Sequence, residues 1–157
     1  MPDQAKPAHA GLKRSAASAG LERRRKASPD SEGRVHVCAT NDLPPGNVRL
    51  IEVAGKQVGV FNVNGSFVAY LNYCPHEGAP VCAGRITGLT EADRPGELRL
   101  TRDNELLCCP WHGWEFDLKT GQCLVDRARL LKYETHVEDG QVYVLPKHGM
   151  TGPPGRP

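Results

Sequence analysis

The sequence predicts an all-β protein, a barrel or sandwich of short antiparallel strands, and three observations favour this fold class. Apolar and polar residues alternate with a period of two in many short segments between residues 34 and 147. Turn signals rich in Gly, Asn and Asp separate these segments. No segment of this region has the 3.6-residue period of an amphipathic helix, and glycine (17) and proline (13) are numerous, which favours turns.

The expected strands follow one another at short intervals. Two pairs of strands flank Asn64-Gly65 and Glu138-Asp139-Gly140, which suit hairpin turns with positive φ. The alternating segment Trp114–Leu118 ends at Thr120-Gly121, and a return strand is expected near Cys123–Val125. The other expected strands are Val35–Val37, Val48–Val53, Val58–Val63, Phe67–Leu71, Leu98–Thr101, Glu105–Cys108, Leu130–Val137 and Val142–Leu145.

Composition divides the chain into one domain and two tails. Residues 1–33 are rich in Ala, Ser, Lys and Arg and hold almost no large apolar side chain, so we expect a disordered basic tail, with a short helix around Ala16–Lys26 as the alternative. Residues 34–147 are of ordinary length for a single domain. Residues 148–157, with three prolines and three glycines, are expected to form a flexible C-terminal tail.

The charge distribution argues against nucleic acid as a partner. Residues 1–33 hold seven basic and four acidic residues, whereas residues 34–157 hold thirteen and fourteen, so the body is close to neutral. No apolar run is long enough to cross a membrane, and no signal peptide is recognisable. We therefore expect a cytoplasmic protein, in which the six cysteines remain reduced and are more often used to bind metal than to form disulfides.

Two short motifs carry the chemistry. Cys74-Pro75-His76 and Cys109-Pro110-Trp111-His112 each supply one thiol and one imidazole, and each follows an expected strand. Two thiolates and two neutral imidazoles carry less negative charge than four thiolates, so this set makes the uptake of an electron less unfavourable. It is the ligand set of a [2Fe–2S] centre in which two histidines replace two cysteines on one iron. A tetrahedral zinc site of the same four residues is the structural alternative.

The segments Cys74–Pro80 and Cys109–Asp117 resemble the two loops of Rieske proteins, most of all those of Rieske-type ferredoxins and of bacterial aromatic-ring oxygenases. Tyr133–Val144 is similar to the closing hairpin of that family, and the resemblance covers roughly residues 34–146. It implies a Rieske-like iron–sulfur fold, in which a basal antiparallel β barrel or sandwich carries a small cluster-binding subdomain with its loops within residues 72–117. It also implies one [2Fe–2S] cluster, and its ligands would be Cys74, His76, Cys109 and His112.

The function that this resemblance implies is one-electron transfer. The protein would be a ferredoxin that passes electrons from a flavin-dependent reductase to a terminal oxygenase, with the two ligand histidines as the exit for the electron. The alternatives are a small Rieske subunit of a larger oxygenase or oxidoreductase, and a zinc-stapled interaction module. A catalytic oxygenase would need a mononuclear iron site with two histidines and a carboxylate, and the remaining histidines form no convincing pair. These are His9, His36, His136 and His148.

Several positions depart from the family pattern. Ala79 and Trp111 stand where respiratory Rieske proteins carry an extra cysteine in each loop, so that disulfide cannot form. Trp114 replaces a serine that donates to a cluster sulfide, which predicts a low reduction potential. Thirty-two residues separate His76 from Cys109, more than is usual for compact ferredoxins. We expect the excess, around Thr87–Pro95 within an insert at residues 87–104, to be an exposed loop.

The remaining chemically notable residues have plainer expected roles. A proline-bearing loop often shields the cluster in this family, but Asp126-Arg127-Ala128-Arg129 lacks proline. Arg127 and Arg129 either place positive charge near the redox face or are ordinary exposed arginines. Trp111 and Trp114 are expected to cover the cluster, to pack the subdomain, or both. The non-ligand cysteines are expected to be small buried thiols, and they are Cys38, Cys82, Cys108 and Cys123.

Overall fold

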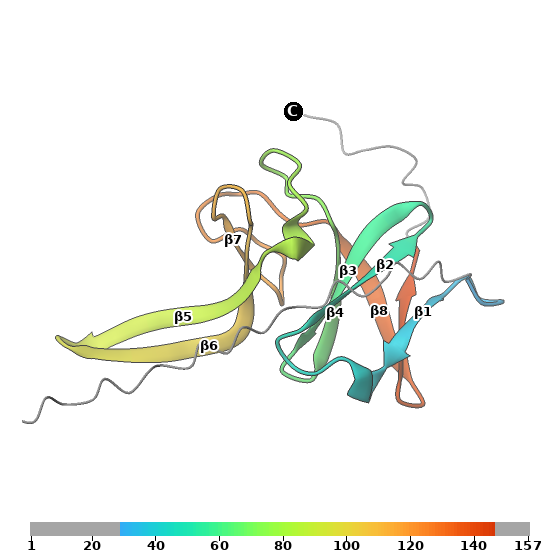
Figure 1. Ribbon diagram of the computed structural model, residues 1–157, viewed down its shortest axis with the longest axis horizontal. Helices are drawn as coiled ribbons and strands as arrows, with labels where there is room; N and C mark the ends of the chain where they lie inside the picture. Colours follow the sequence, from blue (N-terminus) through green and yellow to red (C-terminus); the bar gives the residue numbers. More distant parts are fainter. Residues whose placement is uncertain (1–28, 147–157) are drawn as a thin grey trace, which may run out of the picture.

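The computed structural model describes residues 29–146, and their regular structure is almost entirely β (Figure 1). Strands of the described region form a six-stranded antiparallel sheet in the order β1-β9-β8-β4-β3-β2 and a three-stranded antiparallel sheet in the order β5-β6-β7. The strands are β1 (Val35–Ala39), β2 (Val48–Val53), β3 (Lys56–Val63), β4 (Ser66–Leu71), β5 (Arg85–Arg94), β6 (Glu97–Cys108), β7 (Glu115–Asp117), β8 (Lys132–Glu138) and β9 (Gln141–Leu145). Two 3-10 turns, η1 (Thr40–Asp42) and η2 (Val81–Ala83), complete the elements.

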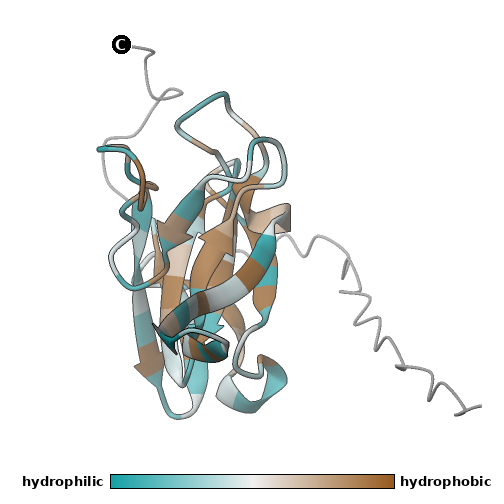
Figure 2. Ribbon diagram, turned by 90° about the vertical axis from the view of Figure 1, so that its left-hand side faces the viewer, coloured by the Kyte–Doolittle hydropathy of each residue, from teal (hydrophilic) through white to brown (hydrophobic). Residues whose placement is uncertain are grey.

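The larger sheet almost closes into a barrel, because its two end strands, β1 and β2, also contact each other. The smaller sheet stands beside it and carries the second ligand loop at the end of β6. Figure 2 shows hydrophobic residues concentrated in the strands that cross the middle of the molecule. The predicted all-β fold, with a basal barrel and a smaller subdomain, is confirmed.

Strands β3 and β4 hold the two parts together because both of their faces are buried. On one face, Val58, Val60 and Ala69 pack into the core of the barrel. On the other face, Phe61 and Tyr70 pack against the subdomain, in a second core that includes the two candidate ligand thiols. The period-two geometry of a strand sends alternate side chains into the two cores. The ligand loops therefore rest directly on the most buried part of the sheet.

The predicted hairpin turns are confirmed. Asn64 and Gly65 join β3 to β4 with φ of 52° and 96°, and Asp139 and Gly140 join β8 to β9 with φ of 48° and 73°. The predicted return strand at Cys123–Val125 is wrong, because only isolated bridges form there. The backbone instead follows an irregular loop, in which the Cys123 amide donates to the Ala128 carbonyl (3.0 Å).

The expected exposed loop at Thr87–Pro95 is also wrong in its secondary structure. Most of this segment belongs to β5, which pairs with β6 in a long hairpin that projects from the molecule (Figure 1). The outer part of the segment is exposed as expected, whereas Thr87–Leu89 are partly buried. One edge of β5 pairs with β6, and the other edge is the open edge of the three-stranded sheet. We call residues 87–104 the arm. Its β6 strand carries two exposed leucines, Leu98 (78% exposed) and Leu100 (58%).

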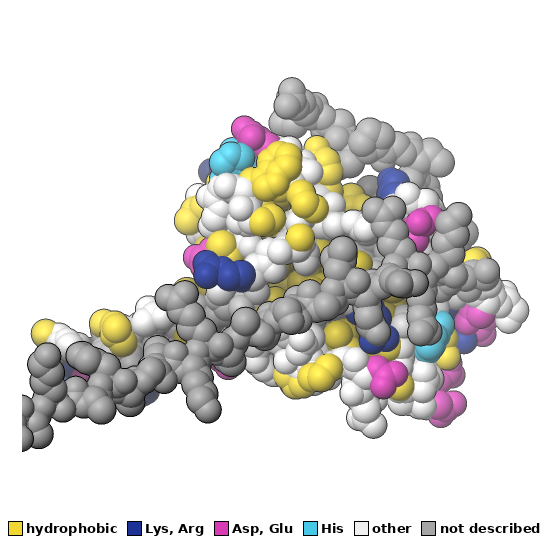
Figure 3. Space-filling view, in the orientation of Figure 1, with side chains coloured by type: hydrophobic (Ala, Val, Ile, Leu, Met, Phe, Trp, Pro, Cys, Tyr) yellow, Lys and Arg dark blue, Asp and Glu magenta, His cyan; other side chains and the backbone are white. Residues whose placement is uncertain are grey.

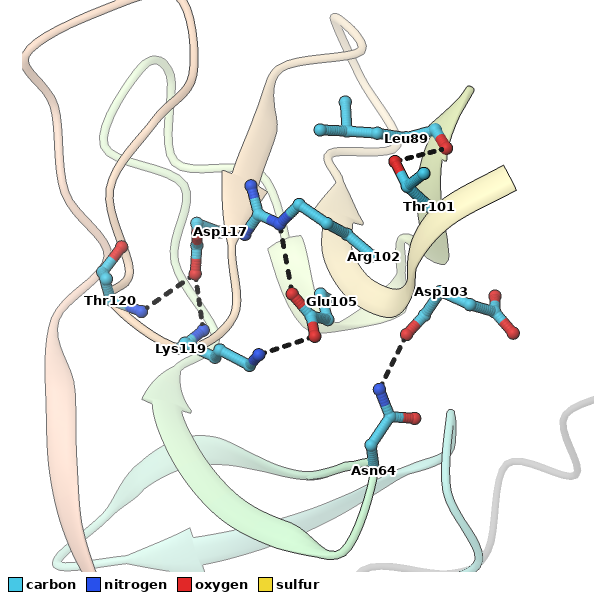
Figure 4. Close-up of polar contacts among 9 residues, drawn as sticks. All are labelled: Asn64, Leu89, Thr101, Arg102, Asp103, Glu105, Asp117, Lys119 and Thr120. Atoms are coloured by element: carbon cyan, nitrogen blue, oxygen red, sulfur yellow. Dashed lines mark hydrogen bonds and ion pairs between the residues drawn. The ribbon is translucent and has the colours of Figure 1, made fainter. Parts of the chain in front are cut away.

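A polar network anchors the base of the arm (Figure 4). The strand register shifts between Thr87 and Leu89, and this bulge brings the guanidinium of Arg102 to the carboxylates of Glu105 (3.1 Å) and Asp117. Lys119 makes a second ion pair with Glu105 (2.6 Å). The network thereby joins β6 to the turn that follows β7.

The ends of the described region add two observations. Residues 29–33, which the sequence assigned to the tail, form a turn in which the Asp30 carboxylate pairs with Arg34 (2.9 Å). The rest of the expected tails, including the alternative helix at Ala16–Lys26, lies outside the described residues. Between residues 29 and 146, no helix combines the length and apolar character that a membrane crossing requires.

Candidate metal centre

The two ligand loops have the same backbone frame. In the first loop, the Cys74 amide donates to the Ala79 carbonyl (2.8 Å) and the Gly78 amide donates to the Cys74 carbonyl (2.8 Å). In the second loop, the Cys109 amide donates to the Trp114 carbonyl (2.8 Å) and the Gly113 amide donates to the Cys109 carbonyl (3.1 Å). Each turn thus spans the same number of residues and opens on a cysteine.

Both turns close through a glycine in the left-handed region. Gly78 has a φ of 78° and Gly113 a φ of 70°, a conformation that other residues adopt only at a cost. The candidate histidine lies two residues after the cysteine in the first loop and three residues after it in the second. The two loops therefore share the same backbone hydrogen bonds but carry His76 and His112 at different distances from their cysteines.

The two thiols are buried and close to each other. Cys74 is 1% exposed and Cys109 is 3% exposed. Burial raises the pKa of the Cys74 thiol to about 11, and the neighbouring Cys109 thiol acts in the same direction. The amides of His76 and Glu77 donate to the Cys74 sulfur and oppose this rise in pKa. A thiolate at this position thus needs a positive partner, which a bound metal supplies.

The two imidazoles form a second pair nearer the surface. The rings of His76 and His112 meet edge to face with their centroids 4.8 Å apart, and both residues are exposed. Figure 3 shows hydrophobic and acidic side chains beside a histidine at this end of the molecule. The site thus consists of two pairs of side chains: the buried thiols of Cys74 and Cys109, and the exposed imidazoles of His76 and His112. We call this the two-by-two arrangement.

This arrangement fits a two-iron cluster. In residues 29–146, no three His, Cys, Asp or Glu side chains gather closely enough to hold one metal ion. A [2Fe–2S] centre of the mixed type makes a different demand, because one iron takes two thiolates and the other takes two imidazoles. The paired thiols and the paired rings match that demand.

Each candidate histidine has a neighbouring side chain from the opposite loop. The indole of Trp114 stacks on the ring of His76, with centroids 4.2 Å apart and planes 11° apart. The Glu77 carboxylate lies 3.7 Å from Nε2 of His112. Trp114 was expected to cover the cluster, to pack the subdomain, or both, but its stack on His76 was not predicted, and neither was a role for Glu77. Neither contact has a local signal, because each depends on the approach of two loops that lie far apart in the sequence.

The other residues that the sequence singled out differ in their surroundings. Trp111 is 57% exposed, whereas Trp114 is partly buried against the subdomain core. The six cysteines are all free thiols; Cys38, Cys82 and Cys123 are buried as expected, but the expectation is wrong for Cys108, which is only partly buried. Arg127 is exposed, and Arg129 hydrogen-bonds Gln122 (2.6 Å), which also donates to the carbonyls of Asp126 (2.9 Å) and Ala128 (3.2 Å). The proline-free loop after β7 is therefore ordered by side-chain bonds of its own.

A small β barrel that carries two loops with paired thiols and paired imidazoles belongs to the class of iron–sulfur proteins that exchange single electrons. Residues 33–133 match the Rieske [2Fe-2S] domain family, and the chain belongs to that family. The cofactor of the family is the [2Fe–2S] cluster that this site fits.

Three known proteins illustrate the likeness. The 3-phenylpropionate/cinnamic acid dioxygenase ferredoxin subunit of Escherichia coli (strain K12) is 29% identical over 113 residues, which cover 71% of this chain and 92% of the subunit. A chain in the solved complex of reduced oxygenase and oxidized ferredoxin in carbazole 1,9a-dioxygenase is 28% identical, with a TM-score of 0.56 over 72% of this chain and 93% of that one. A Mycobacterium tuberculosis protein assigned as an NADH-dependent nitrite reductase small subunit is 27% identical, with a TM-score of 0.53 over 71% and 92% of the two chains.

Proposed function

We propose that this protein is a ferredoxin that carries one electron at a time on a Rieske [2Fe–2S] cluster. Cys74 and Cys109 would hold one iron, and His76 and His112 would hold the other. The observation that carries this proposal is the two-by-two pairing of buried thiols and exposed rings. When bound, the cluster supplies a centre that takes up and releases a single electron.

The chain's own residues suit this role. The barrel and the buried thiols exclude water from one side of the site, which favours a fixed ligand geometry. The exposed rings of His76 and His112 provide the side from which a partner protein can approach. The electron would therefore leave through the imidazole side.

The proposed partners are a flavin-dependent reductase as donor and a terminal oxygenase as acceptor. The support is the likeness to a dioxygenase ferredoxin subunit and to a chain of an oxygenase–ferredoxin complex. The small Rieske subunit of a different oxidoreductase is the second candidate, because a protein assigned as a nitrite reductase subunit is similar to a comparable extent. Reduction by a dioxygenase reductase, followed by oxidation by its oxygenase, would favour the first candidate over the second.

A catalytic role is less well supported by the described residues. His36 and His136 lie on β1 and β8 of the barrel, both exposed, and each is paired in register with Tyr143 rather than with a carboxylate. The residues available for a mononuclear iron site are therefore not gathered in the described region. We infer that the protein serves an oxidoreductase and does not itself transform a substrate.

Anaerobic purification with iron and acid-labile sulfide analysis tests the cofactor assignment. We expect two irons and two sulfides per chain, and an EPR signal after reduction with dithionite. Cys74→Ser and Cys109→Ser should abolish the visible colour. His136→Ala is the matched control and should retain the colour, because that side chain lies on the exposed face of β8. A colourless, EPR-silent protein loaded with zinc would instead support the zinc-stapled module.

A further inference from the structure

The stack of Trp114 on His76 joins the second loop to a candidate ligand of the first loop. His76 is exposed, and within the described region its ring takes part in no hydrogen bond. Its ring contacts are the edge-to-face approach of His112 and the nearly parallel stack of Trp114. With one ring nitrogen bound to a metal, an imidazole that makes no hydrogen bond could still change the tilt of its plane. The stack is therefore the contact best placed to fix the plane of this ring.

Trp114 is itself held firmly enough to act as a support. Its carbonyl accepts the hydrogen bond from the Cys109 amide (2.8 Å), and it directly precedes β7. Its indole packs against the buried core of the subdomain and lies near the ring of Phe116, with centroids 6.5 Å apart. The indole thus contacts both the buried core and the ring of His76. A residue that is fixed by its own packing can transmit that order to a ligand.

We propose that Trp114 is a positioning residue that sets the ring plane of His76, and so couples the second loop to a ligand of the first. This inference rests on the proposed function, because it takes His76 as an iron ligand. Groups around a metal ligand fix its orientation and tune the metal, most often through hydrogen bonds. At His76, the stacked indole of Trp114 would orient the ligand in place of a hydrogen bond. The indole of Trp114 stacks on His76, whereas His112 is approached from the opposite loop by the Glu77 carboxylate, 3.7 Å from its Nε2, so loss of the stack should affect one histidine and not both.

Three variants separate this role from simple packing. Trp114→Phe keeps a flat ring, Trp114→Leu removes it, and Trp111→Leu makes the same change at the other, exposed tryptophan of the loop. In the loaded, dithionite-reduced protein, pulsed EPR resolves the couplings of the two imidazole nitrogens to the cluster. We expect Trp114→Leu to shift or broaden the coupling of one nitrogen and to leave the other unchanged. Trp114→Phe should match the original protein. Trp111→Leu should leave unchanged the coupling that Trp114→Leu shifts, because the Trp111 ring meets the ring of His112 edge to face (centroids 6.5 Å apart) and not that of His76.

The outcomes are distinct from those of the cofactor test. If the original protein holds no [2Fe–2S] cluster, the proposed function fails. If it holds the cluster and Trp114→Leu leaves both couplings unchanged, the positioning role is wrong. Equal changes at both nitrogens would also overturn it, since they would indicate a general loosening of the site. If Trp114→Leu does not fold, Trp114→Met fills a similar volume without a flat ring, and the same expected and contradicting results apply to it.

Discussion

Gly78 and Gly113 occupy equivalent positions in two loops that lie far apart in the sequence. Each donates its amide to the carbonyl of the cysteine four residues before it, and each has a φ near +70° to +80°. The two glycines differ in their surroundings. A Cβ at Gly113 would meet nothing within 4 Å, whereas a Cβ at Gly78 would lie 2.9 Å from the ring of Tyr73.

Alanine substitutions should reveal that difference. Gly113→Ala should lower the free energy of unfolding by about 1–2 kcal/mol, the usual cost of a left-handed alanine. Gly78→Ala should cost more, because the same strain is joined by the contact with Tyr73. Urea unfolding followed by circular dichroism measures both values. A larger loss at Gly113 than at Gly78 would contradict the assigned geometry.

Gly65 provides the control for cluster retention. It has positive φ (96°) and open space around it, but it lies in the β3–β4 turn rather than in a ligand loop. Gly65→Ala should therefore destabilise the fold about as much as Gly113→Ala does. It should not speed the loss of visible colour in air, whereas Gly113→Ala should. Equal bleaching rates would mean that the glycine frame does not contribute to holding the cluster.

The Arg102–Asp117 pair is expected to fix the base of the arm to β7. Partial burial acts to raise the pKa of Asp117, but hydrogen bonds from Arg102 and from the amides of Thr120 and Lys119 outweigh it and hold the pKa below its ordinary value. A double-mutant cycle with Arg102→Ala and Asp117→Asn should give a coupling free energy of about 1 kcal/mol at pH 7. A coupling free energy near zero would show that the Arg102–Asp117 pair does not contribute to stability.

The pH dependence of that coupling has a definite sign. A carboxylate whose pKa is lower in the folded than in the unfolded state contributes stability above its unfolded pKa. The coupling should therefore be constant from pH 7 to pH 5. It should decrease only as the pH falls below the ordinary Asp value of 3.8 and through the lower folded-state pKa. Lys119→Ala is the comparison. The side chain of Lys119 is 55% exposed, so its ion pair with Glu105 should contribute less to the free energy of unfolding than the Arg102–Asp117 pair does.

The leucines of β6 separate the part of the strand that supports the fold from the part that projects. Leu106 is fully buried, and Leu106→Ala should lower the free energy of unfolding by about 2–5 kcal/mol. Leu98 is 78% exposed, so Leu98→Ala should change it by less than about 0.5 kcal/mol. Thermal or urea unfolding measures both. A large loss at Leu98 would show that the arm packs against something in solution.

Local rules explain which features the sequence could predict. The Asn64-Gly65 turn depends on the φ preference of two neighbouring residues, and the candidate ligands depend on the spacing within each loop. Both are readable without tertiary structure. The predicted return strand near Cys123 is reduced to a single bridge to Phe116, in which the Leu124 amide bonds the Glu115 carbonyl and the Asp117 amide bonds the Gln122 carbonyl (both 2.9 Å). The Cys123 amide bonds the Ala128 carbonyl instead, as part of a second isolated bridge, so no continuous strand forms. Alternation alone does not reveal that break.

Other features depend on contacts between distant segments. The arm was expected as a loop because Asp93, Pro95 and Gly96 are typical turn residues, but only Pro95 and Gly96 form the turn, and the segments on either side pair as β5 and β6. The stack of Trp114 on His76 joins residues from two loops, and so does the approach of Glu77 to His112. The residue type of Trp114 predicts that it covers the cluster or packs the subdomain. Its contact with His76 in particular is visible only in the folded chain.

The reduction potential of the cluster provides the last prediction. Hydrogen bonds to the sulfurs stabilise the reduced, more negative state, so fewer donors lower the potential. The Cys74 sulfur accepts bonds from the amides of His76 and Glu77, but the side chain at position 114 is an indole committed to the stack on His76 rather than a hydroxyl. We expect a midpoint potential below zero, in the lower part of the range of about −150 to +300 mV known for such centres. Protein-film voltammetry at pH 7 measures it, and a value well above zero would mean that donors other than these reach the cluster.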